Sequence, residues 1–102
     1  MYNVHKLAEL LQFQAGAVVS RTIIDKPAGT VTLFAFDQEQ GLSDHSAPFD
    51  ALVQVLEGQL VVRVGGHEHS LCAGEMIVMP ADQPHALRAE VPAKLLLTMI
   101  RV

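Results

Sequence analysis

The apolar positions of the chain follow two different periods, and the change falls near residue 17. Residues 4–11 repeat with the period of a helix, with Asn3 placed to cap the first turn and Gly16 placed beyond it as a stop. The apolar residues that would share one helical face are Val4, Leu7, Leu10 and Leu11. The pattern predicts a short helix or helical turn, with His5 on its solvent-exposed side.

After residue 17 the apolar residues alternate, or form short runs rich in β-branched side chains, and glycine or proline separates the runs. The polar residues 38–50 are predicted to form a loop. The predicted strands are residues 17–25, 30–37, 51–58, 59–66, 67–74, 75–80, 85–90 and 94–102. Eight or nine short strands at this spacing are typical of a closed or sandwiched antiparallel domain, so the predicted fold class is all-β.

One predicted strand is apolar on both of its faces. In residues 51–56 the alternating positions are apolar on either side, and Gln54 is the single polar residue. Such a strand must be covered once by the interior of the domain and once more by another layer. Because the predicted N-terminal helix is also apolar on one face, we expect a homodimer to cover the remaining surface.

Composition and charge restrict the partners. The chain has 102 residues, half of them apolar, which suits a single globular domain spanning residues 1–102. A net charge of −4, with seven scattered Lys and Arg residues, argues against nucleic acid as a partner. No leader of signal-peptide form and no apolar run of about 20 residues is seen, so no membrane partner is expected and a cytoplasmic location is predicted.

Several sulfur and imidazole side chains are interpreted as structural. Cys72 stands alone in an apolar run and is predicted to lie in the core. His67 and His69 follow a Gly-Gly turn and are predicted to lie on a surface hairpin. Predicted core-filling residues are Met76, Met79 and Met99 together with Leu95, Leu96 and Leu97. No phosphate-binding loop or nucleophile elbow is present.

Two stretches, residues 41–58 and 74–87, each place a histidine near a proline at the edge of an apolar strand. The second, GEMIVMPADQPHAL, resembles the second signature motif of the cupin family. His85 matches the metal-binding histidine of that motif. Gly74 and Pro80 match its glycine and proline, whereas Asp82 stands at a position that is usually glycine. The resemblance implies a jelly-roll barrel, also called a double-stranded β-helix, with a short N-terminal helix added.

The first stretch resembles the other cupin motif, which normally supplies two histidines and a glutamate as metal ligands. His45 matches the first histidine and Gly58 the closing glycine, but Ala47 and Ala51 stand at the second histidine and the glutamate. The resemblance therefore implies a metal site with half of its ligands missing. It also implies that His45 and His85 meet at the mouth of the barrel, although 40 positions separate them.

Two neutral imidazoles make a weak metal site, because transition metals generally need three or four protein ligands. Asp44 or Asp50 could add a carboxylate, but both face away from His45 if the strand is regular. An irregularity near Pro48 would bring Asp50 to the site. We expect no tightly bound cofactor, with a divalent metal ion at His45 and His85 as the alternative.

Three functions follow from these residues. The first is a small-molecule-binding domain with His45, His85 and, nearby, Gln54 or Arg63 as its orienting polar groups. The second is a metal-dependent enzyme of the oxygenase or isomerase type, using the two histidines. The third is a metal-free enzyme in which His85 acts as a general base.

Overall fold

The computed structural model describes residues 2–102, which form nine strands and one short 3₁₀ turn. The strands are β1 (Val18–Lys26), β2 (Gly29–Phe36), β3 (Gly41–His45), β4 (Phe49–Glu57), β5 (Gln59–Val64), β6 (His67–Cys72), β7 (Met76–Met79), β8 (His85–Arg88) and β9 (Ala93–Arg101). The predicted all-β fold is therefore confirmed. No helix in residues 2–102 is long and apolar enough to cross a membrane.

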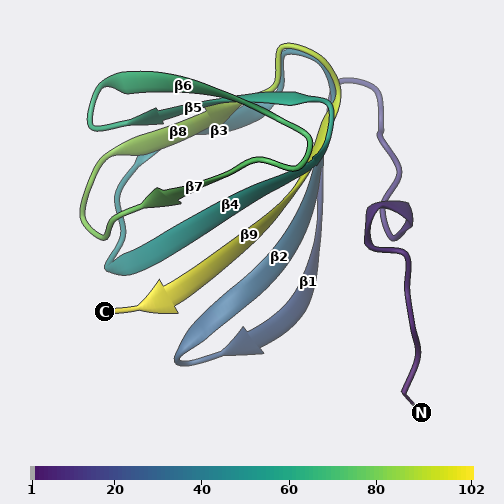
Figure 1. The fold of residues 1–102 in the computed structure, drawn as a ribbon, viewed down its shortest axis with the longest axis horizontal. Coiled ribbons are helices and arrows are strands. Elements are labelled where there is room, and N and C mark those ends of the chain that lie inside the picture. The colour runs from purple at the N-terminus through teal and green to yellow at the C-terminus, as the bar shows by residue number, and fades with distance from the viewer. Residues whose placement is uncertain (1) are drawn as a thin grey trace.

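The strands form two antiparallel sheets that face each other (Figure 1). The five-stranded sheet has the order β1-β2-β9-β4-β7, and the four-stranded sheet has the order β3-β8-β5-β6. Strands from the two ends of the chain lie side by side, since β9 pairs with both β2 and β4, and β8 pairs with both β3 and β5. This interleaving is the topology of a jelly roll, as predicted.

The main core lies between the sheets. In β4, Ala51, Val53 and Val55 point into it, while the residues between them point away. The buried residues of this core are Phe36, Ala51, Val53, Val55, Leu60, Val62, Leu71, Met79, Leu87, Ala89, Ala93, Leu95 and Leu97. The interior is thus filled by side chains, so functional groups must lie at its ends or on its outer faces.

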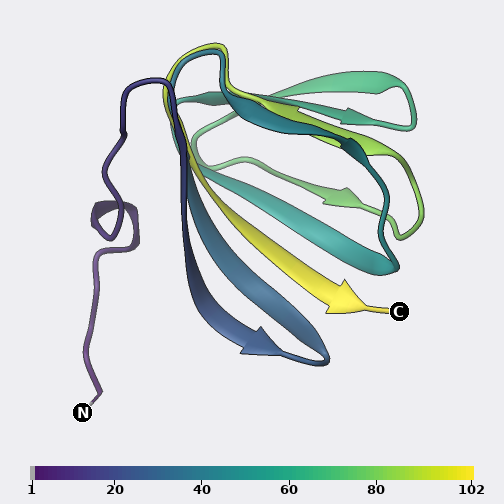
Figure 2. The same ribbon diagram turned by 180° about the vertical axis from the view of Figure 1, so that it is seen from behind.

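A second, smaller core covers part of the outer face of the five-stranded sheet. There Leu7, Leu10, Leu11 and Phe13 pack against Leu33, Ala35, Leu56 and Leu96, together with Val19. This covering matches the expectation that the strands need a second layer. The segment before it runs clear of the two sheets, as the views from both sides show (Figures 1 and 2).

The predicted N-terminal helix is wrong in length. Only Leu7–Glu9 form a 3₁₀ turn, its N-cap residue is Lys6 rather than Asn3, and Val4 is 99% exposed. A helix of two turns does not offset its nucleation cost unless its whole apolar face is packed, and residues 2–6 are exposed. His5 is exposed, as predicted.

Three further predictions are corrected by the structure. Residues 41–45, predicted as loop, form β3, because they pair with β8. Cys72 is exposed because its neighbour Leu71 takes the inward position of β6. Met76 is 53% exposed on the outer side of the edge strand β7, whereas Met79 on the inner side is buried as predicted.

Candidate functional site

His45, the last residue of β3, and His85, the first residue of β8, lie in direct contact. They are partners in the antiparallel pair of β3 and β8, so a separation of 40 positions is closed by strand pairing. Their Nε2 atoms are 3.2 Å apart, and the ring centroids are 4.4 Å apart with the planes at 69°. The prediction that the two side chains lie within reach of each other is confirmed. His85 is only 6% exposed, whereas His45 is open to solvent.

The other ring nitrogen of each histidine is held by the backbone two residues earlier. Nδ1 of His45 lies 2.9 Å from the carbonyl oxygen of Ser43, and Nδ1 of His85 lies 3.1 Å from that of Gln83. A carbonyl oxygen only accepts, so each Nδ1 must carry the proton and donate. In the neutral rings both Nε2 atoms are then left as acceptors.

The number of N–H protons on the two rings determines which of their hydrogen bonds can form. The pair makes three polar contacts, two Nδ1–carbonyl and one Nε2–Nε2, and each needs one N–H proton. Two neutral imidazoles carry only two such protons. The lone pairs of the two Nε2 atoms therefore face each other with no donor between them. The space between these atoms can be occupied by a third proton, by a cation, or by a hydrogen-bond donor on a bound molecule.

Burial disfavours the third proton. Desolvation lowers the pKa of His85 below its ordinary value of 6.5, and the nearby His45 lowers it further. The carbonyl of Gln83 and the carboxylate of Asp44 act in the opposite direction without reversing the net lowering of the His85 pKa. The buried ring is therefore neutral above about pH 6.5.

The pair does not complete a metal centre of the kind the cupin motifs imply. A separation of 3.2 Å suits two nitrogen ligands on one ion, but the other two motif positions carry only the methyl groups of Ala47 and Ala51. Within residues 2–102 no group of three or more His, Cys, Asp or Glu side chains is placed to hold a metal ion. The residues present supply half a ligand set.

Asp50, the carboxylate considered for that site, is used elsewhere. Its Oδ1 atom accepts a hydrogen bond of 2.9 Å from the backbone N–H of Ala81, and the residue is exposed. Because its neighbour Ala51 points into the core, Asp50 points to the outer face of β4.

Gln54 and Arg63 are not brought to the histidines. Gln54 is exposed on the outer face of β4, opposite Met76 of β7. Arg63 points to the outer face of β5, since its neighbours Val62 and Val64 take the inward positions. Strand alternation therefore separates both side chains from the pair.

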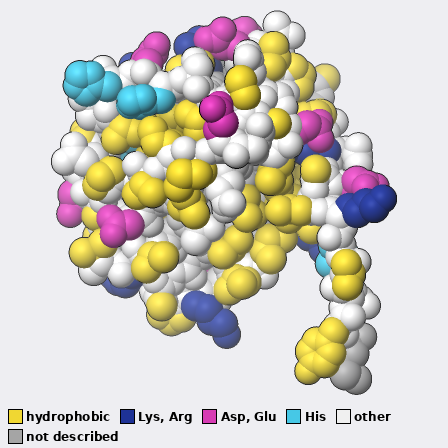
Figure 3. All heavy atoms as spheres, in the orientation of Figure 1, with side chains coloured by type: hydrophobic (Ala, Val, Ile, Leu, Met, Phe, Trp, Pro, Cys, Tyr) yellow, Lys and Arg dark blue, Asp and Glu magenta, His cyan; other side chains and the backbone are white. Residues whose placement is uncertain are grey.

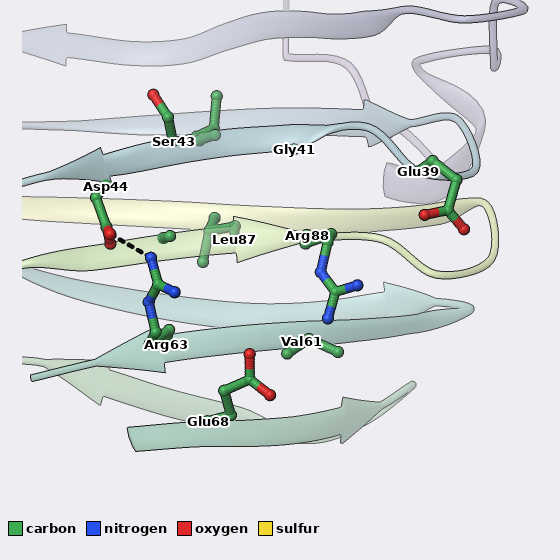
Figure 4. Close-up of a pocket in the computed structure, with 11 residues that line it drawn as sticks. Glu39, Gly41, Ser43, Asp44, Val61, Arg63, Glu68, Leu87 and Arg88 are labelled. Atoms are coloured by element: carbon green, nitrogen blue, oxygen red, sulfur yellow. Dashed lines mark hydrogen bonds and ion pairs between the residues drawn. The ribbon is translucent and has the colours of Figure 1, made fainter. Parts of the chain in front are cut away.

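Arg63 instead lines an open groove of about 570 Å³ on the outer face of the four-stranded sheet (Figure 4). Its guanidinium group forms an ion pair with Asp44, the residue directly before His45. The other charged side chains of the groove are Glu39, Glu68 and Arg88. Sequence reasoning missed this groove. On one face of each of two strands an apolar residue is followed two positions later by an arginine, Val61 by Arg63 and Ala86 by Arg88, and this pattern could have located the groove.

Comparison with known proteins identifies the class. The family model described as a cupin domain matches residues 32–100, so this chain belongs to the cupin family. A cupin 2 conserved barrel domain protein from Leptotrichia buccalis is 38% identical, with a TM-score of 0.93 over 95% of this chain. That match spans only 47% of the Leptotrichia chain.

A conserved protein of unknown function from Streptococcus pyogenes is similar over the whole chain. It has a TM-score of 0.96 and 29% identity, and the match covers 100% of this chain and 90% of that one. A cupin superfamily protein from Desulfitobacterium hafniense, 20% identical with a TM-score of 0.94 over 100% of this chain and 94% of that one, shares the fold. Among curated proteins none matches this chain.

Proposed function

We propose that this cupin is a small-molecule-binding domain whose ligand offers a hydroxyl or amino group to His45 and His85. The observation that carries the proposal is the 3.2 Å contact between two Nε2 atoms whose Nδ1 partners are both occupied by carbonyl oxygens. A donor placed between the two Nε2 atoms supplies the hydrogen bond that the neutral pair lacks.

The surroundings of the pair favour a ligand with an apolar part. Val64 is the partner of His85 on β5, and Leu42 with Leu87 forms the next inward-facing pair along β3 and β8. These side chains are buried or partly buried against the core. Small-molecule sites commonly combine such apolar walls with a few orienting polar groups.

Charge favours a neutral or cationic ligand. Asp44 lies close enough to raise the pKa of His85 against the effect of burial, and the chain carries a net charge of −4. An anionic group placed at the Nε2 atoms would face two acceptor lone pairs and no donor. We therefore propose an alcohol or amine rather than a carboxylate or phosphate, drawn from the small molecules of the cytoplasm.

The first experiment determines the tautomers and then the binding preference. Long-range ¹H–¹⁵N NMR of the histidine rings at about pH 7.5 is expected to show both His45 and His85 protonated at Nδ1. Benzyl alcohol, benzylamine and benzoate are then titrated, because they share one ring and differ in the group presented. The alcohol and the amine are expected to shift the Nε2 resonances, and benzoate is not.

The His85→Asn variant tests the contact directly. The asparagine amide can still donate to the carbonyl of Gln83, but it offers no atom at the Nε2 position, so binding of the alcohol and the amine should be lost. His69→Asn, on an exposed strand position two strands away, is the matched control and should bind as the parent does.

The same titrations separate the other two functions. Preferential binding of benzoate would contradict the proposal. One equivalent of tightly held divalent metal after dialysis would favour the metal-dependent enzyme. Exchange of a ligand C–H proton with solvent, lost in His85→Asn, would make His85 a general base rather than a binding group.

A further inference from the structure

The groove on the outer face of the four-stranded sheet is shaped by small side chains. Its centre is lined by Gly41 and Ser43 of β3, Ala86 of β8 and Val61 of β5. Gly41 cannot be enlarged without moving the backbone, because a Cβ atom there would lie 2.0 Å from the carbonyl oxygen of Leu87. The long charged side chains stand around this floor of small residues. The groove's volume of about 570 Å³ is within the usual range for small-molecule sites.

Strand pairing places a cation and an anion on either side of Val61. Arg63 of β5 has Glu68 of β6 as its partner, and Val61, two residues before Arg63, has Arg88 of β8. All four side chains therefore share the outer face of the sheet. Figure 4 shows the guanidinium group of Arg88 and the carboxylate of Glu68 both extending toward Val61. In the space-filling view, acidic and basic side chains also lie close together along the upper edge, where β5 and β6 run (Figure 3).

The protein itself satisfies only part of this charge. Arg63 forms its ion pair with Asp44 rather than with its cross-strand partner Glu68, and within residues 2–102 Glu68 makes no ion pair. Arg88 has a single ion-pair partner, Glu90, at 3.5 Å, and both of these side chains are about half exposed. An ion pair of that kind contributes little to stability, so Arg88 can exchange it for a ligand. The groove thus offers one carboxylate and one weakly held guanidinium group.

We propose that this groove binds a free α-amino acid with an apolar side chain, its carboxylate on Arg88 and its ammonium group on Glu68. The two charged groups of an amino acid are joined through one carbon atom, so they can meet two opposite charges that approach a single residue, Val61, from the two neighbouring strands. Each contact is a charge-assisted hydrogen bond. The apolar side chain lies on Val61 and Ala86, where Gly41 leaves room. The histidine pair is on the inner face of the same sheet, so this second site goes beyond the proposed function.

The balance of charge in the groove argues against ligands of a single charge. The groove contains three carboxylates, those of Glu39, Asp44 and Glu68. An anion without an ammonium group would be attracted to Arg88 but repelled by these carboxylates. An amine without a carboxylate would be attracted to Glu68 but repelled by the guanidinium group of Arg88. A zwitterion meets both opposite charges and carries no net charge of its own.

Three probes with the same side chain test the two contacts separately. Leucine presents both charges, leucinamide presents only the ammonium group, and N-acetylleucine presents only the carboxylate. They are titrated at about pH 6.5, where α-amino groups are protonated, and binding is followed by the backbone ¹H–¹⁵N signals of β5, β6 and β8. Leucine is expected to shift these signals and to bind at least about tenfold more tightly than either derivative, because each derivative lacks one charge-assisted contact.

Two variants remove one charge each. Arg88→Gln should weaken the binding of leucine and N-acetylleucine at least about tenfold but not that of leucinamide, whereas Glu68→Gln should weaken leucine and leucinamide but not N-acetylleucine. Arg21→Gln on β1 and Glu9→Gln in the 3₁₀ turn make the same chemical changes away from the groove and should bind leucine as the parent does. Circular dichroism establishes that all four variants fold.

A third variant should change the affinity in the opposite direction. Glu90→Gln removes the carboxylate that competes for Arg88, and Glu90 itself does not line the groove. Leucine and N-acetylleucine should therefore bind roughly twofold more tightly than to the parent, in proportion to the small strength of an exposed ion pair. Leucinamide, which makes no contact with Arg88, should not gain affinity in this way.

The outcomes are distinct. Preference for leucine, with each variant weakening only the probes that carry the opposite charge, is the expected result. No shift of the β5, β6 and β8 signals at about 10 mM leucine, well above the Kd of roughly 1 mM expected for two exposed contacts, overturns the proposal. Equal affinity for leucine and leucinamide makes the groove a site for cations, and equal affinity for leucine and N-acetylleucine makes it a site for anions. Either of these results also overturns the proposal, as do leucine shifts confined to the histidine rings.

Discussion

The ammonium group of Lys94 donates a hydrogen bond of 2.6 Å to the carbonyl oxygen of Ala8, across 86 positions of the chain. The lysine side chain is almost fully buried, and it also lies 3.7 Å from Glu57 Oε1 and 5.1 Å from the ring centroid of Phe13. A buried cation on β9 therefore holds the N-terminal segment against the outer face of the larger sheet.

Replacing Lys94 with methionine keeps an apolar side chain of similar length but removes the donor and the charge. We expect the free energy of unfolding to fall by about 2 kcal/mol, because the carbonyl of Ala8 loses its charged partner in a buried place. Urea denaturation measures the change, and limited proteolysis should cut residues 7–13 first. Lys26→Met, at the exposed end of β1, is the control and should change stability by less than about 0.5 kcal/mol. Equal stabilities for the two variants would contradict this account.

The strands were predictable because their signals are local. Alternating apolar residues separated by glycine and proline turns located eight of the nine strands to within a few residues. β3 was missed because its five residues are mostly polar and gain their pairing from β8, whose residues lie 40 or more positions away. The N-terminal helix was over-predicted because the periodicity of residues 4–11 does not reveal that only their last part has a surface to pack on.

Only the part of the site that belongs to the two sequence motifs could be predicted. The motif match correctly placed His45 against His85. No motif position supported Gln54 or Arg63, and Asp50 depended on an irregular strand. Each of these three side chains points outward because its neighbours occupy the inward positions of the strand. The roles of the two Nδ1 atoms depend on carbonyl oxygens two residues earlier, and no pattern of side chains encodes that geometry.

Stability should depend on pH through His85. Burial lowers the pKa of the folded His85 below 6.5, so between the two values the unfolded chain binds more protons than the folded one. This contribution to stability is fully present above about pH 6.5 and is lost as the pH falls through the lowered pKa of the folded state. Urea denaturation at a series of pH values should show this decline in the parent and in His69→Asn, but not in His85→Asn. If the parent protein instead became more stable on acidification from pH 7 to about 5.5, the prediction would be wrong.

Cys72 should react readily in the folded protein. It is exposed at the end of β6, and its sulfur lies 3.5 Å from the Nε2 atom of Gln59, which is a weak contact. We expect a thiol reagent such as dithiobisnitrobenzoate to modify the native protein at a rate within about tenfold of that in urea, because exposure rather than unfolding controls access. A native rate thousands of times slower would show that the thiol is buried after all.

The last prediction concerns the missing half of the metal site. We expect the parent protein to bind divalent metals weakly, since His45 and His85 offer two neutral nitrogens and no carboxylate. Ala47→His combined with Ala51→Glu should create tight binding. Ala51 is buried in the core cluster on the inward side of β4, and Ala47 is half-buried in the turn that leads into that strand. The new imidazole and the new carboxylate would therefore act as the third and fourth metal ligands beside the two Nε2 atoms.

The free energy of unfolding of the double variant, measured with and without metal, shows whether a metal site has formed. Without metal, the buried glutamate should lower the free energy of unfolding by a few kcal/mol, roughly the cost of an unpaired charge in an apolar place. Added zinc or manganese should restore it, and at about 100 times the dissociation constant the gain is roughly 2.7 kcal/mol. The control is Ala47→Gln with Ala51→Gln, which matches the glutamate in size but carries no charge, and metal should stabilise it no more than the parent. Parent protein that keeps one equivalent of metal through dialysis would refute the prediction, because two histidines and an outward-pointing Asp50 offer no reason for such affinity.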